Sequence, residues 1–172
     1  MKPINKLLIA LLLGFYGTGA FALESDKDQP ITIDSNTATY DDASATSIYT
    51  GNVISIQGSL RVESDKLVVH FIDGDADKLV FTGNKARFKQ TPKEGDEDIT
   101  GEALTGEYYP KKNLLILIEK ATVWQGNGTY SSELIEYDSR NSVVKAGEST
   151  SDSKRVHVTL QPKSKTKEKK PQ

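Results

Sequence analysis

The chain contains no cysteine and only two histidines among its 172 residues. Without cysteine there are no disulfides, no thiolate nucleophiles and no cysteine-ligated metal sites. His70 and His157 lie far apart and are flanked by residues typical of strands, which favours structural or exposed positions. The motifs G-x-S-x-G and H-E-x-x-H and the P-loop motif are also absent. The sequence therefore predicts that the protein is not an enzyme and needs no cofactor and no metal.

Long apolar runs are equally scarce. Leu7 to Phe15 is almost wholly apolar but is too short to span a bilayer, and no other stretch is long enough. Lys2 and Lys6 precede this run, and Ala20-Phe21-Ala22 follows it as a small-x-small cleavage motif. Residues 1–22 are therefore predicted to be a secretory signal peptide cleaved after Ala22, which indicates export to a bacterial periplasm.

Charge is distributed unevenly along the chain. From Lys154 onward the charged side chains are basic except Glu168, and the body before them is acidic. An acidic body is unsuited to the phosphates of nucleic acid, so we expect no nucleic-acid partner. Residues 163–172 are predicted to form a basic disordered tail.

The rest of the chain shows the pattern of short strands separated by turns. Gly51-Asn52 and Gln57-Gly58 interrupt runs of β-branched and apolar residues, which indicates turns or bulges. Thr91 to Asp98 is rich in proline, glycine and charge and is the longest loop that we expect. Strands are predicted at 31–33, 37–40, 47–55, 60–62, 67–72, 79–82, 86–88, 104–108, 114–118, 123–124, 133–137, 142–146 and 155–160, with no helix of any length. Such spacing is typical of an antiparallel sandwich, barrel or roll, in which a second layer buries the apolar face.

Parts of the sequence resemble one another at a shift of 68 residues. Ile56-Gln57-Gly58 then coincides with Trp124-Gln125-Gly126, and Leu67 and Val69 coincide with Ile135 and Tyr137. This similarity suggests one strand-turn-strand unit stacked on copies of itself. The alternative is that any all-β chain shows some self-similarity.

Two segments are apolar on both faces of a strand. They are Leu67 to Ile72 and Leu114 to Ile118, and the second is predicted to be covered on both sides. Aromatic residues also occur among aliphatic ones at alternate positions. These side chains either fill a core or line an apolar binding groove, and the apolar surplus favours the groove.

Three groups of stretches carry a resemblance to a known family. They are Asp28 to Ile33, then Tyr49 to Val53 with Gln57-Gly58 and Ser64 to Leu67, and finally Lys154 to Val156 with Leu160 to Pro162. These stretches resemble the LptA, or OstA-like, family of periplasmic lipopolysaccharide-transport proteins. The resemblance covers nearly the whole mature chain. The acidic loop between Thr91 and Asp98 departs from the family pattern.

The resemblance implies an all-β fold, a twisted, V-shaped antiparallel jellyroll open at both ends, over residues 23–162. It implies a non-enzymatic periplasmic protein that binds the lipid A part of lipopolysaccharide in an apolar groove. The family's members stack head to tail and bridge inner-membrane and outer-membrane transport components built on the same roll. These partners are expectations for this chain.

The resemblance also suggests which residues carry these roles. Ile31 and Ile33 match ligand-facing positions near one mouth of the groove, and Phe71, Phe88 and Tyr108 match positions along it. The complete lipid-binding set that we predict is Ile31, Ile33, Val69, Phe71, Phe88, Tyr108, Ile116 and Trp124. The predicted oligomer interface joins the first strand (Ile31, Thr32, Ile33) to the last (Val156, Val158, Leu160).

Two other functions fit the same sequence. One is a structural, adhesin-like β-repeat module that associates with itself and has no lipid ligand. The other is a lipid chaperone that acts as a monomer.

Overall fold

A computed structural model describes residues 26–93, 95–147 and 155–162. The predicted signal peptide and the basic tail lie outside the described residues. The described part begins with a short 3₁₀ turn, η1 (Asp26–Asp28), and a second, η2 (Pro110–Lys112), precedes Leu114. All other regular structure in these ranges is strand, which confirms the predicted all-β class.

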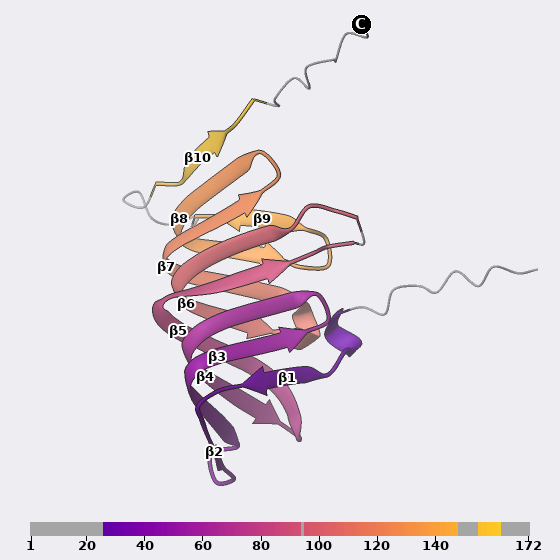
Figure 1. Ribbon diagram of the computed structural model, residues 1–172, viewed down its shortest axis with the longest axis vertical. Helices are drawn as coiled ribbons and strands as arrows, with labels where there is room; N and C mark the ends of the chain where they lie inside the picture. The colour runs from indigo at the N-terminus through magenta and orange to yellow at the C-terminus, as the bar shows by residue number, and fades with distance from the viewer. Residues whose placement is uncertain (1–25, 94, 148–154, 163–172) are drawn as a thin grey trace, which may run out of the picture.

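Ten strands follow one another along the described chain (Figure 1). Six of them, β3 to β8, are long and make up the body of the protein. The strands are β1 (Ile31–Asp34), β2 (Thr37–Asp41), β3 (Thr46–Gln57), β4 (Leu60–Ile72), β5 (Asp75–Gln90), β6 (Ile99–Tyr109), β7 (Leu114–Gln125), β8 (Gly128–Asp138), β9 (Val143–Ala146) and β10 (His157–Leu160).

Each strand pairs with its neighbour in an antiparallel sense. The order is β1-β3-β4-β5-β6-β7-β8-β10, while β2 also pairs with β3 and β9 also pairs with β8. Two short strands pair with different halves of the same long strand: β1 pairs with residues 54–57 of β3, and β2 pairs with residues 46–50 of β3. In the same way β10 pairs with residues 128–131 of β8 and β9 with residues 135–138.

A line of register shifts crosses the long strands near their midpoints. It runs through Thr50/Val53, Glu63/Lys66, Thr82/Ala86, Glu102/Thr105 and Ile118/Ala121. Several residues along it have positive φ, among them Gly51, Lys85 and Lys120. Bulges bend a strand and increase its twist, so an aligned row of them folds the sheet along one crease.

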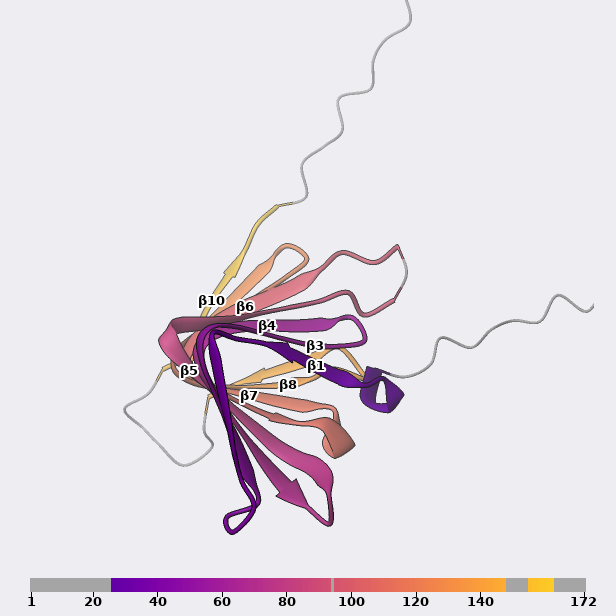
Figure 2. The same ribbon diagram turned by 60° about the horizontal axis from the view of Figure 1, so that its bottom comes forward.

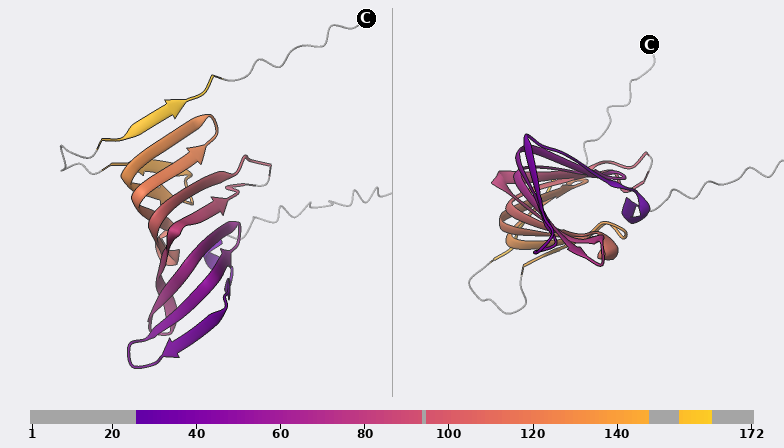
Figure 3. Two further views of the ribbon diagram at one scale, coloured as in Figure 1. Left: turned by 60° about the vertical axis from the view of Figure 1, so that its left-hand side comes forward. Right: turned by 90° about the horizontal axis from the view of Figure 1, so that it is seen from below.

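The crease gives the molecule two layers joined on one side and open on the other, the V shape visible in Figures 2 and 3. One layer holds β1, β10 and the halves of the long strands paired with them. The other holds β2, β9 and the remaining halves. Alternate residues point into the V and form the core, which includes Leu67, Phe81, Leu117, Val123 and Ile135.

The 68-residue similarity coincides with matching pieces of this architecture. Gln57-Gly58 and Gln125-Gly126 both end a long strand and enter a tight hairpin, with positive φ at each glycine. Leu67 and Val69, like Ile135 and Tyr137, point inward and are buried. The repeated unit is therefore a hairpin with the same inward-facing positions.

The structure corrects the sequence prediction in several places. Pairs of predicted strands, such as 79–82 and 86–88, are halves of one bent strand because a bulge interrupts pairing without ending the strand. Asp75 to Lys78, which lies between the predicted strands 67–72 and 79–82, belongs to β5, and only Asp73-Gly74 turns. The prediction that Leu114 to Ile118 is covered on both sides is wrong: its outward residues stay half-buried, and no second layer covers them within the described residues.

Candidate functional site

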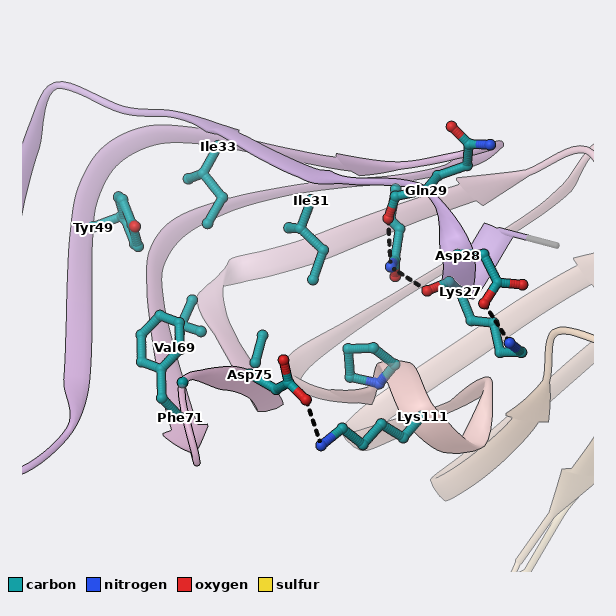
Figure 4. A pocket seen from close by; sticks show the side chains of 14 residues that line it. Lys27, Asp28, Gln29, Ile31, Ile33, Tyr49, Val69, Phe71, Asp75 and Lys111 are labelled. Atoms are coloured by element: carbon teal, nitrogen blue, oxygen red, sulfur yellow. Dashed lines mark hydrogen bonds and ion pairs between the residues drawn. The ribbon is translucent and has the colours of Figure 1, made fainter. Parts of the chain in front are cut away.

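A cavity of about 620 Å³ lies between the two layers at the β1 end of the V (Figure 4). Its apolar wall combines Ile31 and Ile33 of β1 with Tyr49 of β3 and Val69 and Phe71 of β4. These residues come from both layers, since β1 belongs to one and residues 66–72 of β4 to the other. Four of the eight predicted lipid-binding residues, Ile31, Ile33, Val69 and Phe71, are thus brought together.

Polar side chains border the cavity on one side. Lys27 forms an ion pair with Asp28, and Lys111 lies 3.2 Å from the carboxylate of Asp75. All four are substantially exposed, so these ion pairs contribute little to stability. The site therefore has an apolar interior and a charged, wet margin.

Two buried hydrogen bonds link the layers at the open side of the V. The Tyr108 hydroxyl donates to Gln57 Oε1 at 2.9 Å, and the Tyr137 hydroxyl donates to Gln90 Oε1 at 2.7 Å. In both cases the tyrosine belongs to one layer and the glutamine to the other. Gln57, Gln90, Tyr108 and Tyr137 thus form a row of buried polar groups. Because Gln57 also lines the cavity, this row adjoins the apolar wall.

The segment of residues 26–29 covers that row. Gln57 Nε2 donates to the backbone carbonyls of Lys27 and Gln29, at 3.2 and 3.0 Å. Gln90 Nε2 donates to Asp26 Oδ2 at 2.8 Å. Ser59 adds two further donors to the Asp26 carboxylate, its amide at 3.0 Å and its hydroxyl at 2.6 Å.

The two tyrosines are kept neutral by this environment. Burial raises the pKa of the Tyr108 hydroxyl well above its usual range, and the nearby Asp26 carboxylate adds to the effect. Burial likewise raises the pKa of Tyr137, to about 12. Both hydroxyls therefore remain hydrogen-bond donors at neutral pH.

Phe88 and Tyr108 point inward, as predicted, but belong to the packed middle of the V. Phe88 is 4% exposed and stacks on Tyr137 with ring centroids 5.5 Å apart. Tyr108 is 2% exposed. Their side chains fill the interior beyond the cavity, so a ligand that extends past the β1 end must displace or repack them.

Ile116 and Trp124 lie on the other face of β7. Their neighbours Leu115, Leu117 and Val123 are buried, whereas Ile116 is half-buried and Trp124 is 39% exposed on the outside of the V. The prediction that these two residues share one interior surface with Ile31 and Phe71 is corrected. In a sheet the side chains alternate, and the inward phase of β7 falls on the odd-numbered residues.

Sequence reasoning missed Tyr49, Tyr137, Asp26 and the two buried glutamines. Gln57 and Gln90 carried a signal, because each continues the inward alternation of a strand where an apolar residue is expected. Their partners lie 51 and 47 residues away, and only the fold brings them together.

The two ends of the sheet carry unpaired strand edges. β1 and β10 each pair with one neighbour on the path, and their other edges have no strand partner in the described ranges. These edges lie at opposite ends of the molecule (Figure 1). Val158 and Leu160 stand opposite Tyr130 and Gly128 on the inward face, and Leu160 is 71% exposed.

Comparison with known proteins settles the family. Residues 32–143 match the family model described as LptA/(LptD N-terminal domain) LPS transport protein. The chain belongs to this family. The matched residues run from β1 to the first residue of β9. They include the whole apolar wall of the cavity except Ile31.

Individual relatives support the same family assignment. The chain is 31% identical to the lipopolysaccharide export system protein LptH of Pseudomonas aeruginosa, over 96% of this chain and 99% of that protein. It is 32% identical to the lipopolysaccharide export system protein LptA of Escherichia coli K12, over 78% of this chain and 72% of that one. A crystal structure of LptH, described as the LptA-homologous periplasmic component of the lipopolysaccharide transport device of P. aeruginosa, superposes with a TM-score of 0.74 at 28% identity. The match covers 81% of this chain and all of that one.

Family membership assigns the chain a role in lipopolysaccharide transport, which is a non-enzymatic role. It also confirms the V-shaped jellyroll as the fold. The described residues contain no helix with the length and apolarity needed to cross a membrane. Nor do they contain a cluster of three or more side chains suited to holding a metal ion.

Proposed function

We propose that this chain is a periplasmic protein that binds the lipid A part of lipopolysaccharide and carries its acyl chains between the two layers of the V. The observation that supports this most is the cavity beside β1, whose wall is built from Ile31, Ile33, Val69 and Phe71. The periplasmic location follows from the predicted signal peptide and from the periplasmic relative.

Burial of hydrocarbon provides the affinity. Moving one CH₂ group out of water is worth about 0.8 kcal/mol, so an acyl chain of a dozen carbons contributes roughly 10 kcal/mol before ordering costs. An exposed ion pair contributes at most about 1 kcal/mol. Lys27 and Lys111 at the cavity margin therefore adjust the fit of an anionic head group, while acyl burial dominates.

The sheet edges support head-to-tail assembly. The path from β1 to β10 holds eight antiparallel strands in the described chain, so its two end strands run in opposite directions. Placing β10 of one copy beside β1 of the next continues the antiparallel alternation. The exposed inward residues of β10, Val158 and Leu160, then extend the apolar floor toward Ile31 and Ile33 of the neighbour, and Val156 lies just before this strand.

Such a contact is heterologous and open-ended, so it produces a filament and not a closed ring. Main-chain hydrogen bonding between exposed edges supplies the interaction. We propose that this stack joins inner-membrane and outer-membrane transport components whose jellyrolls offer the same edges.

Photo-crosslinking tests the lipid site directly. A photoreactive residue at Ile33 should form an adduct with purified lipopolysaccharide, since this side chain lines the cavity. The matched control is the same residue at Thr32, which is exposed on the same strand. Equal adduct yields at the two positions, or none at either, would refute the proposed binding site.

The other two functions predict different results. A structural module without a lipid ligand would form no adduct at Ile33 but would still associate with itself. A monomeric lipid chaperone would form the adduct and show no dependence of its size on concentration.

A further inference from the structure

The row of buried polar groups at the open side of the V lies next to the apolar cavity but is not needed to bury hydrocarbon. Gln57 and Gln90 are 5% and 3% exposed. Their side-chain oxygens accept from the two buried tyrosines, which fixes both amide groups with their N–H donors directed at residues 26–29. The row thus presents a fixed pair of donors toward the opening.

Residues 26–29 supply the acceptors for these donors. The acceptors are two backbone carbonyls and one carboxylate oxygen. A buried amide donor without an acceptor is costly, so the row must be covered either by this segment or by another molecule that offers oxygen atoms.

The covering segment is held by hydrogen bonds from side chains and from the Ser59 amide, and not by strand pairing. None of the three residues of η1 is buried, and Asp26 holds the segment through hydrogen bonds to Ser59 and Gln90. Figure 3, in its view from below, shows η1 at the open side, away from the crease. Detaching it would expose the row and one side of the cavity without breaking a strand pair.

We propose that Gln57 and Gln90, oriented by Tyr108 and Tyr137, bind the carbonyl oxygens of an acylated saccharide, and that residues 26–29 are a displaceable cover occupying this row until the ligand enters. The inference deepens the proposed function and rests on it. In an acylated saccharide each hydrocarbon chain begins at an ester or amide carbonyl. Chains in the cavity therefore place their carbonyls near Gln57, which lines both the cavity and the row.

The absence of cysteine allows a clean test of the cover. The double variant Asp26→Cys/Ser59→Cys places two thiols where the side chains now meet at 2.6 Å, and oxidation locks the segment onto the β3–β4 hairpin. With the photoreactive residue at Ile33 and purified lipid A as the probe, the oxidised protein should give about tenfold less adduct than its reduced form. The wild-type background has no thiol and serves as the control for the reductant.

Each outcome is informative. Equal adduct yields from the oxidised and reduced forms would overturn the displaceable cover while leaving the proposed lipid site intact. No adduct from either form or from the wild-type background would refute the lipid site itself, and this inference with it.

The variant Gln57→Glu tests the binding row. It keeps an acceptor for the Tyr108 hydroxyl but replaces the amide donor with an oxygen that repels both the cover and a ligand carbonyl. We expect faster hydrogen exchange in residues 26–29 together with about fivefold weaker lipid A binding, while circular dichroism shows the sheet retained. Binding as tight as or tighter than wild type, with the cover loosened, would show that the row does not contact the ligand.

Discussion

At the residue scale, Gly101 shows how tightly the middle of the V is packed. A Cβ at this position would lie 2.3 Å from Phe88 Cε1 and 2.9 Å from the backbone oxygen of Thr122. The ring can shift, but the backbone oxygen belongs to a paired strand and cannot move without disturbing the sheet. The glycine therefore allows Phe88 to stack on Tyr137.

We expect Gly101→Ala to lower the free energy of unfolding by about 1–3 kcal/mol, because overpacking displaces the Phe88 ring and the neighbouring strand. Urea denaturation would measure the change. Gly106→Ala on the same strand is the matched control: its nearest atom would be 3.8 Å away, so we expect wild-type stability or a gain of up to about 1 kcal/mol. Equal losses at both positions would contradict this account.

Tyr137 predicts how stability depends on alkaline pH. Its pKa is raised from 10.0 to about 12 in the folded protein, chiefly by burial, so folding favours the neutral phenol. The stabilisation is fully present below pH 10.0 and is lost as the pH rises toward about 12. In Tyr137→Phe the free energy of unfolding should fall less steeply over this interval, which denaturation at a series of pH values would show. An unchanged slope would argue that the hydroxyl ionises as freely in the folded as in the unfolded chain.

At the scale of single elements, β1 combines two roles. Its inward residues Ile31 and Ile33 form one wall of the cavity, while its backbone presents an unpaired edge. The four residues of β1 thus contribute to both the proposed lipid site and the proposed assembly. A substitution in β1 is therefore expected to affect lipid binding, assembly or both.

Ile31→Asp should weaken lipid A binding by at least about tenfold, because a carboxylate in the apolar wall must be desolvated when an acyl chain is bound. Displacement of a fluorescent fatty-acid probe by lipid A would measure this. Thr32→Asp places the same charge on the exposed face of the same strand and should leave binding near wild type. Similar losses in both variants would indicate that the strand edge, and not the cavity wall, is being perturbed.

At the scale of the whole molecule, the two open edges predict assembly. The chain shortened after Gly147 lacks β10, and the chain shortened after Pro162 lacks only the basic tail. Light scattering over a range of concentrations should show growth for the second and a constant monomer for the first. Only the second keeps β10, which runs antiparallel to β1 of the next copy, whereas the β8 edge exposed without β10 runs parallel to β1. Identical behaviour of the two shortened chains would rule out β10 as the joint.

The folded sheet also explains why the interior is divided. A single crease brings the two layers together, so large side chains such as Phe81, Phe88 and Tyr137 fill the middle. Near β1 the layers carry smaller or partly exposed side chains, and there the cavity forms. Passage of a long ligand therefore depends on how far the layers can separate at their open side.

The sequence by itself determined the class of fold, most strand positions and the long loop at residues 91–98. It also placed Ile31 with Ile33, and Val69 with Phe71, on shared faces of their strands, while their inward direction was implied by the family resemblance. These features depend on local alternation and turn residues, which are properties of neighbouring positions. The alternation failed for Ile116, because Leu114 to Ile118 is apolar at every position and either phase could face inward. It failed for Trp124 because the adjacent Val123 is equally apolar. Only the tertiary structure decided that phase, since the partner strands on each side fix it.

The tertiary structure also decided what the buried glutamines do. Gln57 and Gln90 accept hydrogen bonds from tyrosines in the opposite layer and donate hydrogen bonds to residues 26–29. All of these partners are distant in sequence. Contacts of this kind arise when a row of bulges folds one sheet back on itself, and no local pattern encodes which side chains then meet.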